Sequence, residues 1–141
     1  MESRVTEADA RHKRGFNCAQ AVACTYCDLV GVSEAEAFRS MEAFGLGMGG
    51  MQGTCGALSG AVYLAGLITS DGNLEAPASK KSSYAVSREL LERFGAQNGS
   101  VICRELKGIG CDHGVLRACP LCIADACELV EKVLFSEQFE D

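Results

Sequence analysis

The sequence predicts an all-α protein: a single-domain helical bundle of about five to seven helices, with a glycine-rich loop before a buried central helix. Apolar residues recur at helical spacing through almost the whole chain, and no run of β-branched residues alternates with polar ones. Two pairs of residues that typically start helices precede apolar stretches. The length of 141 residues suits one domain, and no repeat or linker divides it. We therefore expect one cysteine-rich helical domain over residues 1–141.

The first third of the chain contains start and stop signals for three helices. We expect them over residues 2–14, 17–30 and 33–44. Gly15 ends the first helix. Asn17 with Gln20 and Ser33 with Glu36 have the spacing of a capping box, in which two side chains three residues apart each bond the other residue's backbone N–H. These pairs predict the starts of the second and third helices.

A glycine-rich loop at residues 45–53 precedes the expected central helix. Thr54 is a natural N-cap, and a helix from there to Thr69 has a length of roughly 22 Å at 1.5 Å per residue. No charged residue occurs between Glu42 and Asp71, so we expect this helix to be buried. Its apolar part is shorter than the ~20 residues that a bilayer requires, and we expect no membrane insertion.

The remaining chain predicts three more helices. A long one covers residues 78–96 and is closed by Gly99. A short one starts at Ser100. The last one starts beside Pro120, because proline favours the first turn of a helix, and it ends near Phe139.

Composition restricts the class of partner and the compartment. The chain has 13 Lys and Arg against 19 Asp and Glu, a formal net charge of -6. A nucleic-acid partner would call for a clustered positive surface, so we expect none. The first fifteen residues are polar and lack the apolar core of a secretory signal. We therefore expect a cytoplasmic protein.

Nine cysteines are the main anomaly of this composition. Structural disulfides are rare in a reducing compartment, where a cysteine cluster more often indicates metal binding or redox chemistry. Four of the nine lie in or beside the first turn of an expected helix: Cys18, Cys55, Cys103 and Cys119. Unpaired backbone N–H groups and the positive end of the helix dipole favour an anion there, which is the reactive and metal-binding form of a thiol.

The other cysteines have less specific positions. Cys119 and Cys122 form a CPLC motif, which resembles a redox dithiol, although the βαβ pattern of thioredoxin-like proteins is absent. Cys122 and Cys127 flank the face of the last helix that should be buried, and either could replace a metal ligand. Three further cysteines fit a packing role as well as a functional one: Cys24, Cys27 and Cys111. The two histidines, His12 and His113, are expected at the surface.

The glycine-rich loop could let its backbone approach an anion closely. Gly50, Gly53 and Gly56 are the candidates, since glycine permits conformations and contacts that a side chain would block. The anion could be a phosphate, a thiolate or a sulfide-bridged cluster. Neither a P-loop nor a dinucleotide-binding fingerprint fits these residues. Close packing of helices explains the same glycines equally well.

Together these motifs resemble a known family. They are NCAQAV at 17–22, GLGMGG at 45–50, CGALSG at 55–60, CREL at 103–106, and CP at 119–120 before the last helix. The set is similar to the C-GCAxxG-C-C family of redox-active proteins over about residues 11–134. The resemblance implies that the four family cysteines are Cys18, Cys55, Cys103 and Cys119. A related domain in split-Soret cytochromes carries haem and an iron–sulfur centre, but this chain lacks the CxxCH motif that covalent haem requires.

Three hypotheses follow for the chemistry. The first is an iron–sulfur cluster held by Cys18, Cys55, Cys103 and Cys119, which would transfer electrons to a redox partner protein that the sequence does not identify. The second is a thiol–disulfide oxidoreductase, in which Cys119 attacks and Cys122 or a family cysteine resolves. The third is a structural zinc site with four thiolate ligands. The sequence leaves open whether the protein is an enzyme. A chain this rich in glycine and alanine along its central helix could also pack against a copy of itself as a homodimer.

Overall fold

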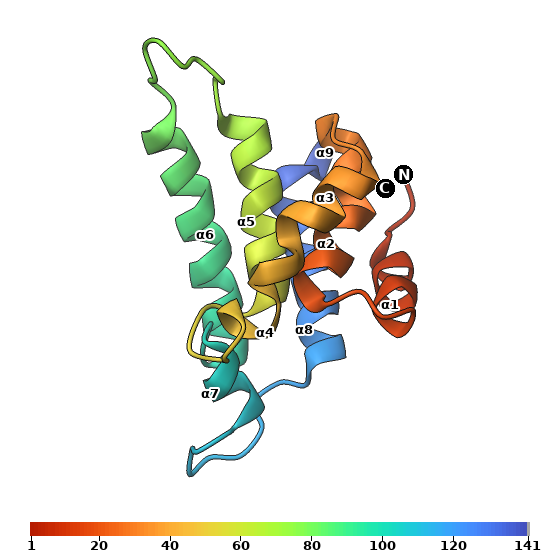
Figure 1. The fold of residues 1–141 in the computed structure, drawn as a ribbon, viewed down its shortest axis with the longest axis vertical. Helices are drawn as coiled ribbons and strands as arrows, with labels where there is room; N and C mark the ends of the chain where they lie inside the picture. Colours follow the sequence, from red (N-terminus) through yellow and green to blue (C-terminus); the bar gives the residue numbers. More distant parts are fainter. Residues whose placement is uncertain (141) are drawn as a thin grey trace.

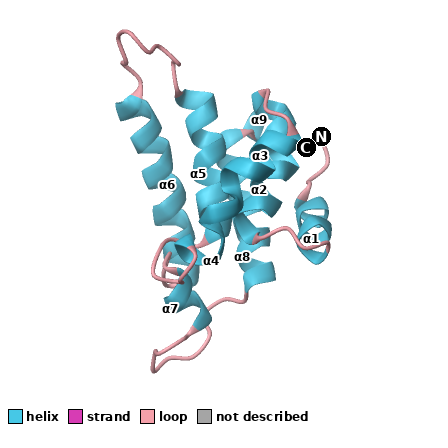
Figure 2. Cartoon of the chain, in the orientation of Figure 1, coloured by secondary structure: helices cyan, strands magenta, loops and turns pink. Residues whose placement is uncertain are grey.

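The computed structural model describes residues 1–140 and confirms the all-α class (Figure 1). Within these residues no strand forms, and loops alone connect the helical segments (Figure 2). Six helices have eight residues or more: α1 (Val5–Lys13), α2 (Cys18–Tyr26), α3 (Glu34–Met41), α5 (Gly56–Thr69), α6 (Lys80–Asn98) and α8 (Cys119–Leu129). The short segments are α4 (Gly45–Met48), α7 (Cys103–Lys107), α9 (Ser136–Phe139), 3-10 turns at Cys27–Val30 and Glu42–Phe44, and a π turn at Val130–Leu134.

The expected central helix is α5, which packs against α2, α6 and α8 (Figure 1). Its inward side chains include Leu58 and Leu64, which are fully buried. Gly60 allows α2 to approach, because a Cβ at this position would lie 2.7 Å from the carbonyl oxygen of Ala19. In residues 1–140, no helix combines the length and the apolar character that crossing a membrane demands.

Both predicted helix starts in the first third of the chain are confirmed. Asn17 Oδ1 accepts from the N–H of Gln20 at 2.9 Å, and Gln20 Oε1 accepts from the N–H of Asn17 at 3.0 Å, so the capping box is complete. Ser33 Oγ accepts from the N–H of Glu36 at 3.1 Å. The Glu36 carboxylate contacts the hydroxyl of Ser40 instead of returning a bond. Ser33 is therefore a simple N-cap.

The helix boundaries differ from the prediction at both termini of the chain. α1 begins three residues later than expected, because the chain start binds the C-terminal segment: Arg4 N–H donates to Glu131 at 2.8 Å and the N-terminal ammonium donates to the Gln138 carbonyl at 2.9 Å. The last helix is not continuous. It changes to a π turn and breaks at Phe135, whose ring turns inward and stacks on Tyr26 with ring centroids 6.3 Å apart.

The N-caps of two helices also lie elsewhere than predicted. Cys55, not Thr54, is the N-cap of α5, and α7 begins at Cys103 rather than at Ser100. The physical reason is an isolated antiparallel bridge between Thr54 and Ile102, which keeps both residues extended. Such a contact between distant segments is invisible to local helix signals.

The glycine-rich loop contains α4 and curls through left-handed backbone conformations. Three of its non-glycine residues have positive φ: Leu46 (55°), Met48 (67°) and Met51 (69°). This region is sterically unfavourable for residues with a side chain. Residues in such conformations persist only where the surrounding structure holds them, and they cluster at functional sites.

Candidate functional site

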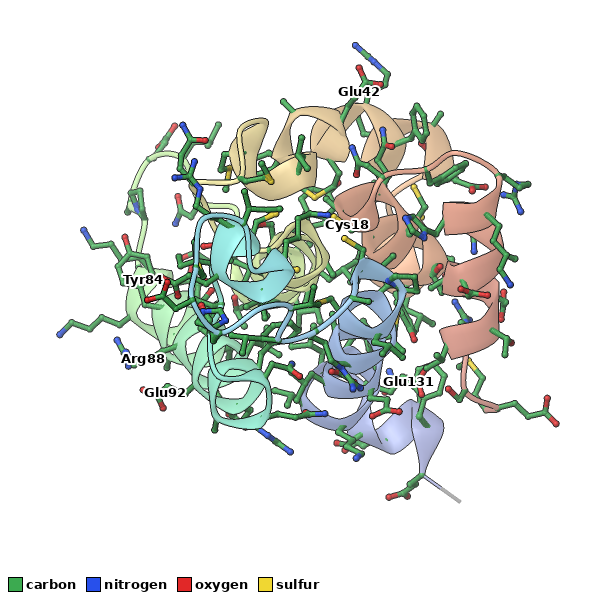
Figure 3. The ribbon with its side chains drawn as sticks, turned by 90° about the horizontal axis from the view of Figure 1, so that it is seen from below. Cys18, Glu42, Tyr84, Arg88, Glu92 and Glu131 are labelled. Atoms are coloured by element: carbon green, nitrogen blue, oxygen red, sulfur yellow. The ribbon has the colours of Figure 1, made fainter. Side chains whose placement is uncertain are left out.

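Five cysteines surround one cavity at the end of the bundle where α2, α5, α7 and α8 begin. The cavity has a volume of about 180 Å³. It is lined by His12, Asn17, Cys18, Leu46, Cys55, Gly56, Cys103, Lys107, Cys119 and Cys122. Figure 3 views the molecule from below Figure 1, and Cys18 is labelled there among the neighbouring sulfur atoms. The structure thus brings the four cysteines at the helix starts to one place.

Cys18 is the first residue of α2, directly after the N-cap Asn17. Burial raises the pKa of its thiol above the ordinary range, and the nearby Cys55 raises it further. The backbone N–H groups of Leu46 and Ala19 act in the opposite direction and lower the pKa. The curled loop therefore contributes a donor to this sulfur through Leu46.

Cys55 lies at the start of α5 beside Cys122 of α8. Hydrogen bonding with Cys122 raises the pKa of the Cys55 thiol above the ordinary range, and burial adds to this effect. The backbone N–H groups of Leu58 and Ala57 act in the opposite direction and lower the pKa of the same thiol. Cys122 also contacts the carbonyl oxygen of Arg117, at 3.6 Å from its sulfur. Two thiols from different helices are thus neighbours.

Backbone hydrogen bonds hold the segments that contain Cys55 and Cys103 side by side. The N–H of Cys55 donates to the carbonyl of Val101 at 2.8 Å, and the N–H of Cys103 donates to the carbonyl of Gly53 at 3.0 Å. These bonds lie on either side of the Thr54–Ile102 bridge. The extended residues before α5 and α7 therefore run antiparallel, and both helices begin beside the cavity.

Cys103 packs against the glycine-rich loop. A Cβ at Gly47 would collide with the Cys103 side chain and approach the Gly53 carbonyl oxygen to 2.9 Å, so only glycine fits there. Burial raises the pKa of the Cys103 thiol, while the Lys107 ammonium lowers it. Lys107 lies four residues after Cys103, on the same face of α7.

Lys107 also contacts the sulfur of Cys119. Its Nζ donates to Cys119 Sγ at 3.0 Å. The pKa of Lys107 is raised, first by this contact and in smaller part by Cys103 and Cys18, against the opposing effect of burial. The Lys107 ammonium therefore lies at the start of α8, where its positive charge favours negative charge on the sulfur atoms around it.

A bidentate ion pair fixes the segment that leads into α8. Arg117 Nε and Nη2 donate to the two carboxylate oxygens of Asp125, both at 3.0 Å. Asp125 is buried. The N–H groups of Leu116 and Arg117 both donate to the carbonyl of Leu106, at 2.9 and 3.1 Å. These contacts tie the start of α8 to α7 and so determine where Cys119 lies relative to Lys107.

The three glycines predicted to contact a ligand have different positions. Gly56 lines the cavity, and a Cβ there would collide with Cys18 Sγ. Gly53 supplies the carbonyl that pairs with Cys103. Gly50 is exposed and does not line the cavity. The close approach of the Cys18 sulfur to α5 therefore requires glycine at position 56.

Four of the nine cysteines lie away from this cavity: Cys24, Cys27, Cys111 and Cys127. Cys127 is fully buried beside Tyr26, and burial raises its pKa to about 12. Cys24 and Cys27 line a separate groove at the other end of α2. Cys111 is on the loop before α8, where His113 is exposed as expected.

Four residues that line the cavity were not predicted as site residues: His12, Asn17, Leu46 and Lys107, of which Asn17 was predicted only as a helix cap. His12 was expected to be solvated, but it is half-buried and faces the cysteines. Lys107 could have been found from its spacing of four residues from Cys103, which places both on one helical face. Leu46 gives no such signal, because its role depends on a left-handed backbone conformation.

Repulsion between thiolates limits how many thiols of this cavity can be ionised at the same time. The charge of each neighbouring cysteine raises the pKa of Cys18, Cys55 and Cys103. Several thiolates can therefore be stable here together only if a cation or a covalent bond compensates for them. All nine cysteines are free. Within residues 1–140, no group of three or more His, Cys, Asp and Glu side chains is arranged to hold a single metal ion.

The comparisons with known proteins identify a family. The model of the family described as "Putative redox-active protein (C_GCAxxG_C_C)" matches residues 16–133, which is more than half of the chain. No curated protein and no solved structure gives a significant match. The matched range contains all five cysteines of the cavity and the glycine-rich loop. The chain therefore belongs to the C_GCAxxG_C_C family of redox-active proteins.

Proposed function

We propose that the protein is an electron carrier in which Cys18, Cys55, Cys103 and Cys119 hold an iron–sulfur cluster. The convergence of these four cysteines on one cavity, each from the start of a different helix, is the observation that supports the proposal most strongly. Four cysteine thiolates are the usual ligand set of such clusters.

The donor set and the surroundings suit a cluster. The cavity of about 180 Å³ is several times the roughly 30 Å³ that one water molecule occupies in the liquid. Backbone N–H groups of Leu46 and Ala57 and the Lys107 ammonium would offset the negative charge of the thiolates. Hydrogen bonds and charges near the sulfurs are the features that adjust a cluster's reduction potential.

A single zinc ion makes a different demand on the same residues. It would require its ligand sulfurs at about 2.3 Å from one point. In the described residues 1–140, no group of three or more His, Cys, Asp and Glu side chains is placed to hold a metal ion. A cluster presents several iron atoms, so its thiolates do not have to close around one centre. When bound, the cluster would supply one-electron redox chemistry, while the chain would hold it, shield it and set its charge environment.

Metal and sulfide analysis of the protein after anaerobic reconstitution tests the proposal. We expect iron and acid-labile sulfide in equal amounts, together with visible absorption that bleaches on reduction. Serine at any of the four proposed ligands should lower the iron content, whereas Cys111→Ser, outside the cavity, should not. Wild-type protein that binds neither iron nor sulfide would overturn the proposal, and firmly bound zinc in their place would support the structural zinc site.

A second candidate, thiol–disulfide exchange, is favoured by the contact between Lys107 and Cys119. In this reaction the Cys119 thiolate attacks a substrate disulfide and forms a mixed disulfide, releasing one thiol. A neighbouring cysteine then displaces the second thiol and forms an internal disulfide. Cys122 is the expected resolving residue, and it lies beside Cys55 as well. If this candidate holds, Cys119→Ser abolishes the exchange and the wild-type protein contains negligible metal.

A further inference from the structure

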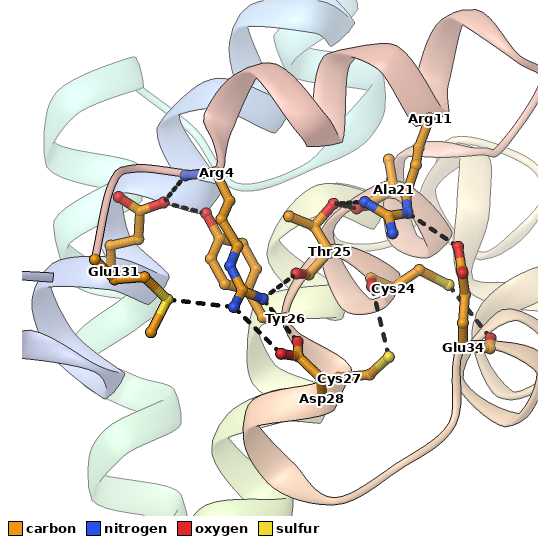
Figure 4. Close-up of polar contacts among 11 residues, drawn as sticks. Arg4, Arg11, Ala21, Cys24, Thr25, Tyr26, Cys27, Asp28, Glu34 and Glu131 are labelled. Atoms are coloured by element: carbon orange, nitrogen blue, oxygen red, sulfur yellow. Dashed lines mark hydrogen bonds and ion pairs between the residues drawn. The ribbon is translucent and has the colours of Figure 1, made fainter. Parts of the chain in front are cut away.

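A second pair of cysteines lines a groove at the opposite end of α2 from Cys18. Cys24 and Cys27 lie in a groove of about 490 Å³, together with Arg4, Arg11, Asp28 and other residues of α1 and the segment before α3. Figure 4 shows both thiols beneath the side chains of Arg4 and Arg11. Neither cysteine lines the cavity that holds the family cysteines.

The backbone places these two sulfurs on one face. α2 ends at Tyr26 and a 3-10 turn begins at Cys27, so the pair spans a junction between two helix types. Tyr26 departs from helical geometry, with φ -121° and ψ 2°, so residues 24–27 approximate a type I turn. The first and last Cα atoms of such a turn lie less than about 7 Å apart. A disulfide requires a Cα separation of roughly 4.4–6.8 Å, which this turn permits.

Neither thiol has a strong hydrogen-bond partner. Cys27 Sγ lies 3.5 Å from the carbonyl oxygen of Cys24, and Cys24 Sγ lies 3.6 Å from that of Glu34. These are weak thiol-to-carbonyl contacts. Both cysteines are free, with exposed fractions of 3% and 4%. The groove, not the outer surface, is therefore the route to the sulfurs.

Two ion pairs border the groove and bring cations near the thiols. Arg4 pairs with Asp28 at 2.7 Å, and Arg11 pairs with Glu34 at 3.1 Å. Both arginines are mostly buried and also donate to Thr25, Arg4 to its carbonyl oxygen and Arg11 to its hydroxyl, so the cations are fixed beside the groove. Burial raises the pKa of Cys24 to about 11 and that of Cys27 above the ordinary range, while Arg11 lowers both. The resting pair is thus a protonated dithiol.

We propose that Cys24 and Cys27 form a second redox centre, a dithiol that reduces low-molecular-weight disulfides and closes into a disulfide itself. One cysteine loses its proton to solvent and attacks the substrate disulfide, which releases one thiolate and leaves a mixed disulfide. The other cysteine then attacks the mixed disulfide at the protein sulfur and releases the second thiolate. Two protein thiols are oxidised, one substrate disulfide is reduced to two thiols, and the two protons end on the products.

This centre is independent of the proposed iron–sulfur cluster. α2 carries a proposed cluster ligand at its first residue and the dithiol at its other end, about 9 Å further along the axis at 1.5 Å per residue. The two centres face different cavities and share no cysteine. Each can therefore be removed without the other.

Peptide mapping after reaction with 2-hydroxyethyl disulfide tests the proposal. No Lys or Arg occurs between residues 14 and 39, so one tryptic peptide contains Cys18, Cys24 and Cys27. The folded protein is treated anaerobically with the probe, and the remaining thiols are alkylated after denaturation. We expect the mass of this peptide to fall by two hydrogen atoms, because Cys24 and Cys27 form a disulfide while Cys18 is alkylated. Two molecules of 2-mercaptoethanol should be released for each disulfide formed.

Matched variants separate this result from other chemistry. Cys24→Ser and Cys27→Ser should each abolish the loss of two hydrogen atoms, and Cys111→Ser should retain it. Two results on the wild-type protein alone would overturn the proposal. One is recovery of the peptide with all three thiols alkylated, and the other is a disulfide from Cys24 or Cys27 to a different cysteine. Iron content is measured on the same samples. Cys18→Ser should lower the iron and keep the Cys24–Cys27 reaction, whereas the Cys24→Ser, Cys27→Ser double variant should keep the iron.

Discussion

The Lys107 ammonium lies 3.0 Å from the sulfur of Cys119, and Lys107 is the only Lys or Arg that lines the cysteine cavity in residues 1–140. Reduction of a bound cluster adds negative charge, which a nearby cation stabilises. Lys107→Met should therefore lower the reduction potential of the reconstituted protein by tens of millivolts, where roughly 60 mV corresponds to a tenfold change in a one-electron equilibrium. A redox titration followed by visible absorption measures the shift.

Two variants separate charge from structure in that experiment. Lys107→Arg keeps the positive charge and should retain most of the wild-type potential. Arg104→Met removes a charge from the same short helix, but Arg104 is exposed and does not line the cavity. Solvent screens an exposed charge, so its removal should have a much smaller effect. Equal shifts in Lys107→Met and Arg104→Met would show that the contact with Cys119 does not set the potential.

Gly56→Ala should damage the site, whereas Gly66→Ala on the same helix should not. A Cβ at Gly56 would collide with Cys18 Sγ and lie 3.2 Å from the Phe44 carbonyl oxygen. Overpacking of this kind costs about 1–3 kcal/mol. A Cβ at Gly66 would meet no atom within 4 Å, so alanine there should stabilise the helix by up to about 1 kcal/mol. Urea unfolding measures both free energies, and iron content reports the site. Similar losses of iron in the two variants would contradict this prediction.

Local signals made the helix starts predictable where a side chain caps its own helix. The reciprocal bonds of Asn17 and Gln20 were predicted from their spacing alone, and they place Cys18 in the first turn of α2. The cap at Ser33 was found in the same way. At these positions sequence neighbours make the deciding contact, so the sequence is sufficient.

Long-range contacts decided the features that were not predicted. Thr54 is extended because it bridges to Ile102, far away in the sequence, and the N-cap therefore shifts to Cys55. The last helix breaks because the Phe135 ring packs on Tyr26. Each outcome depends on a partner that no helical period identifies, and the same holds for the contact of Lys107 with Cys119.

Asn17→Ala should cost more than Ser33→Ala and should also disturb the cysteine cavity. Each substitution removes an N-cap, which contributes about 1 kcal/mol. Asn17 makes an additional hydrogen bond from Nδ2 to the Glu42 carbonyl at 2.9 Å, worth about another 1 kcal/mol, and it lines the cavity. We expect urea unfolding to show a loss in the free energy of unfolding of roughly 2 kcal/mol for Asn17→Ala and about 1 kcal/mol for Ser33→Ala. Iron retention should fall only in the Asn17 variant, and an equal fall in both would show that the cap of α2 has no specific role at the site.

Stability should decline at alkaline pH because burial raises the pKa of the Cys127 thiol to about 12. A thiol in the unfolded chain releases its proton near pH 8.5, so above that pH the unfolded state binds fewer protons than the folded state. The free energy of unfolding then falls with pH by up to about 1.4 kcal/mol per pH unit for each such thiol, until the pH reaches the folded pKa. The stabilising contribution is fully present below pH 8.5.

Cys127→Ala should lower stability at pH 7, because it leaves a small cavity beside Tyr26, but it should make the decline between pH 8.5 and 11 less steep. Cys24→Ala should also reduce the slope up to pH 11, where the raised pKa of that thiol lies. Urea unfolding under anaerobic, reducing conditions at several pH values measures the slopes. Parallel curves for the wild type and Cys127→Ala would show that this thiol ionises equally in both states, and they would contradict its burial.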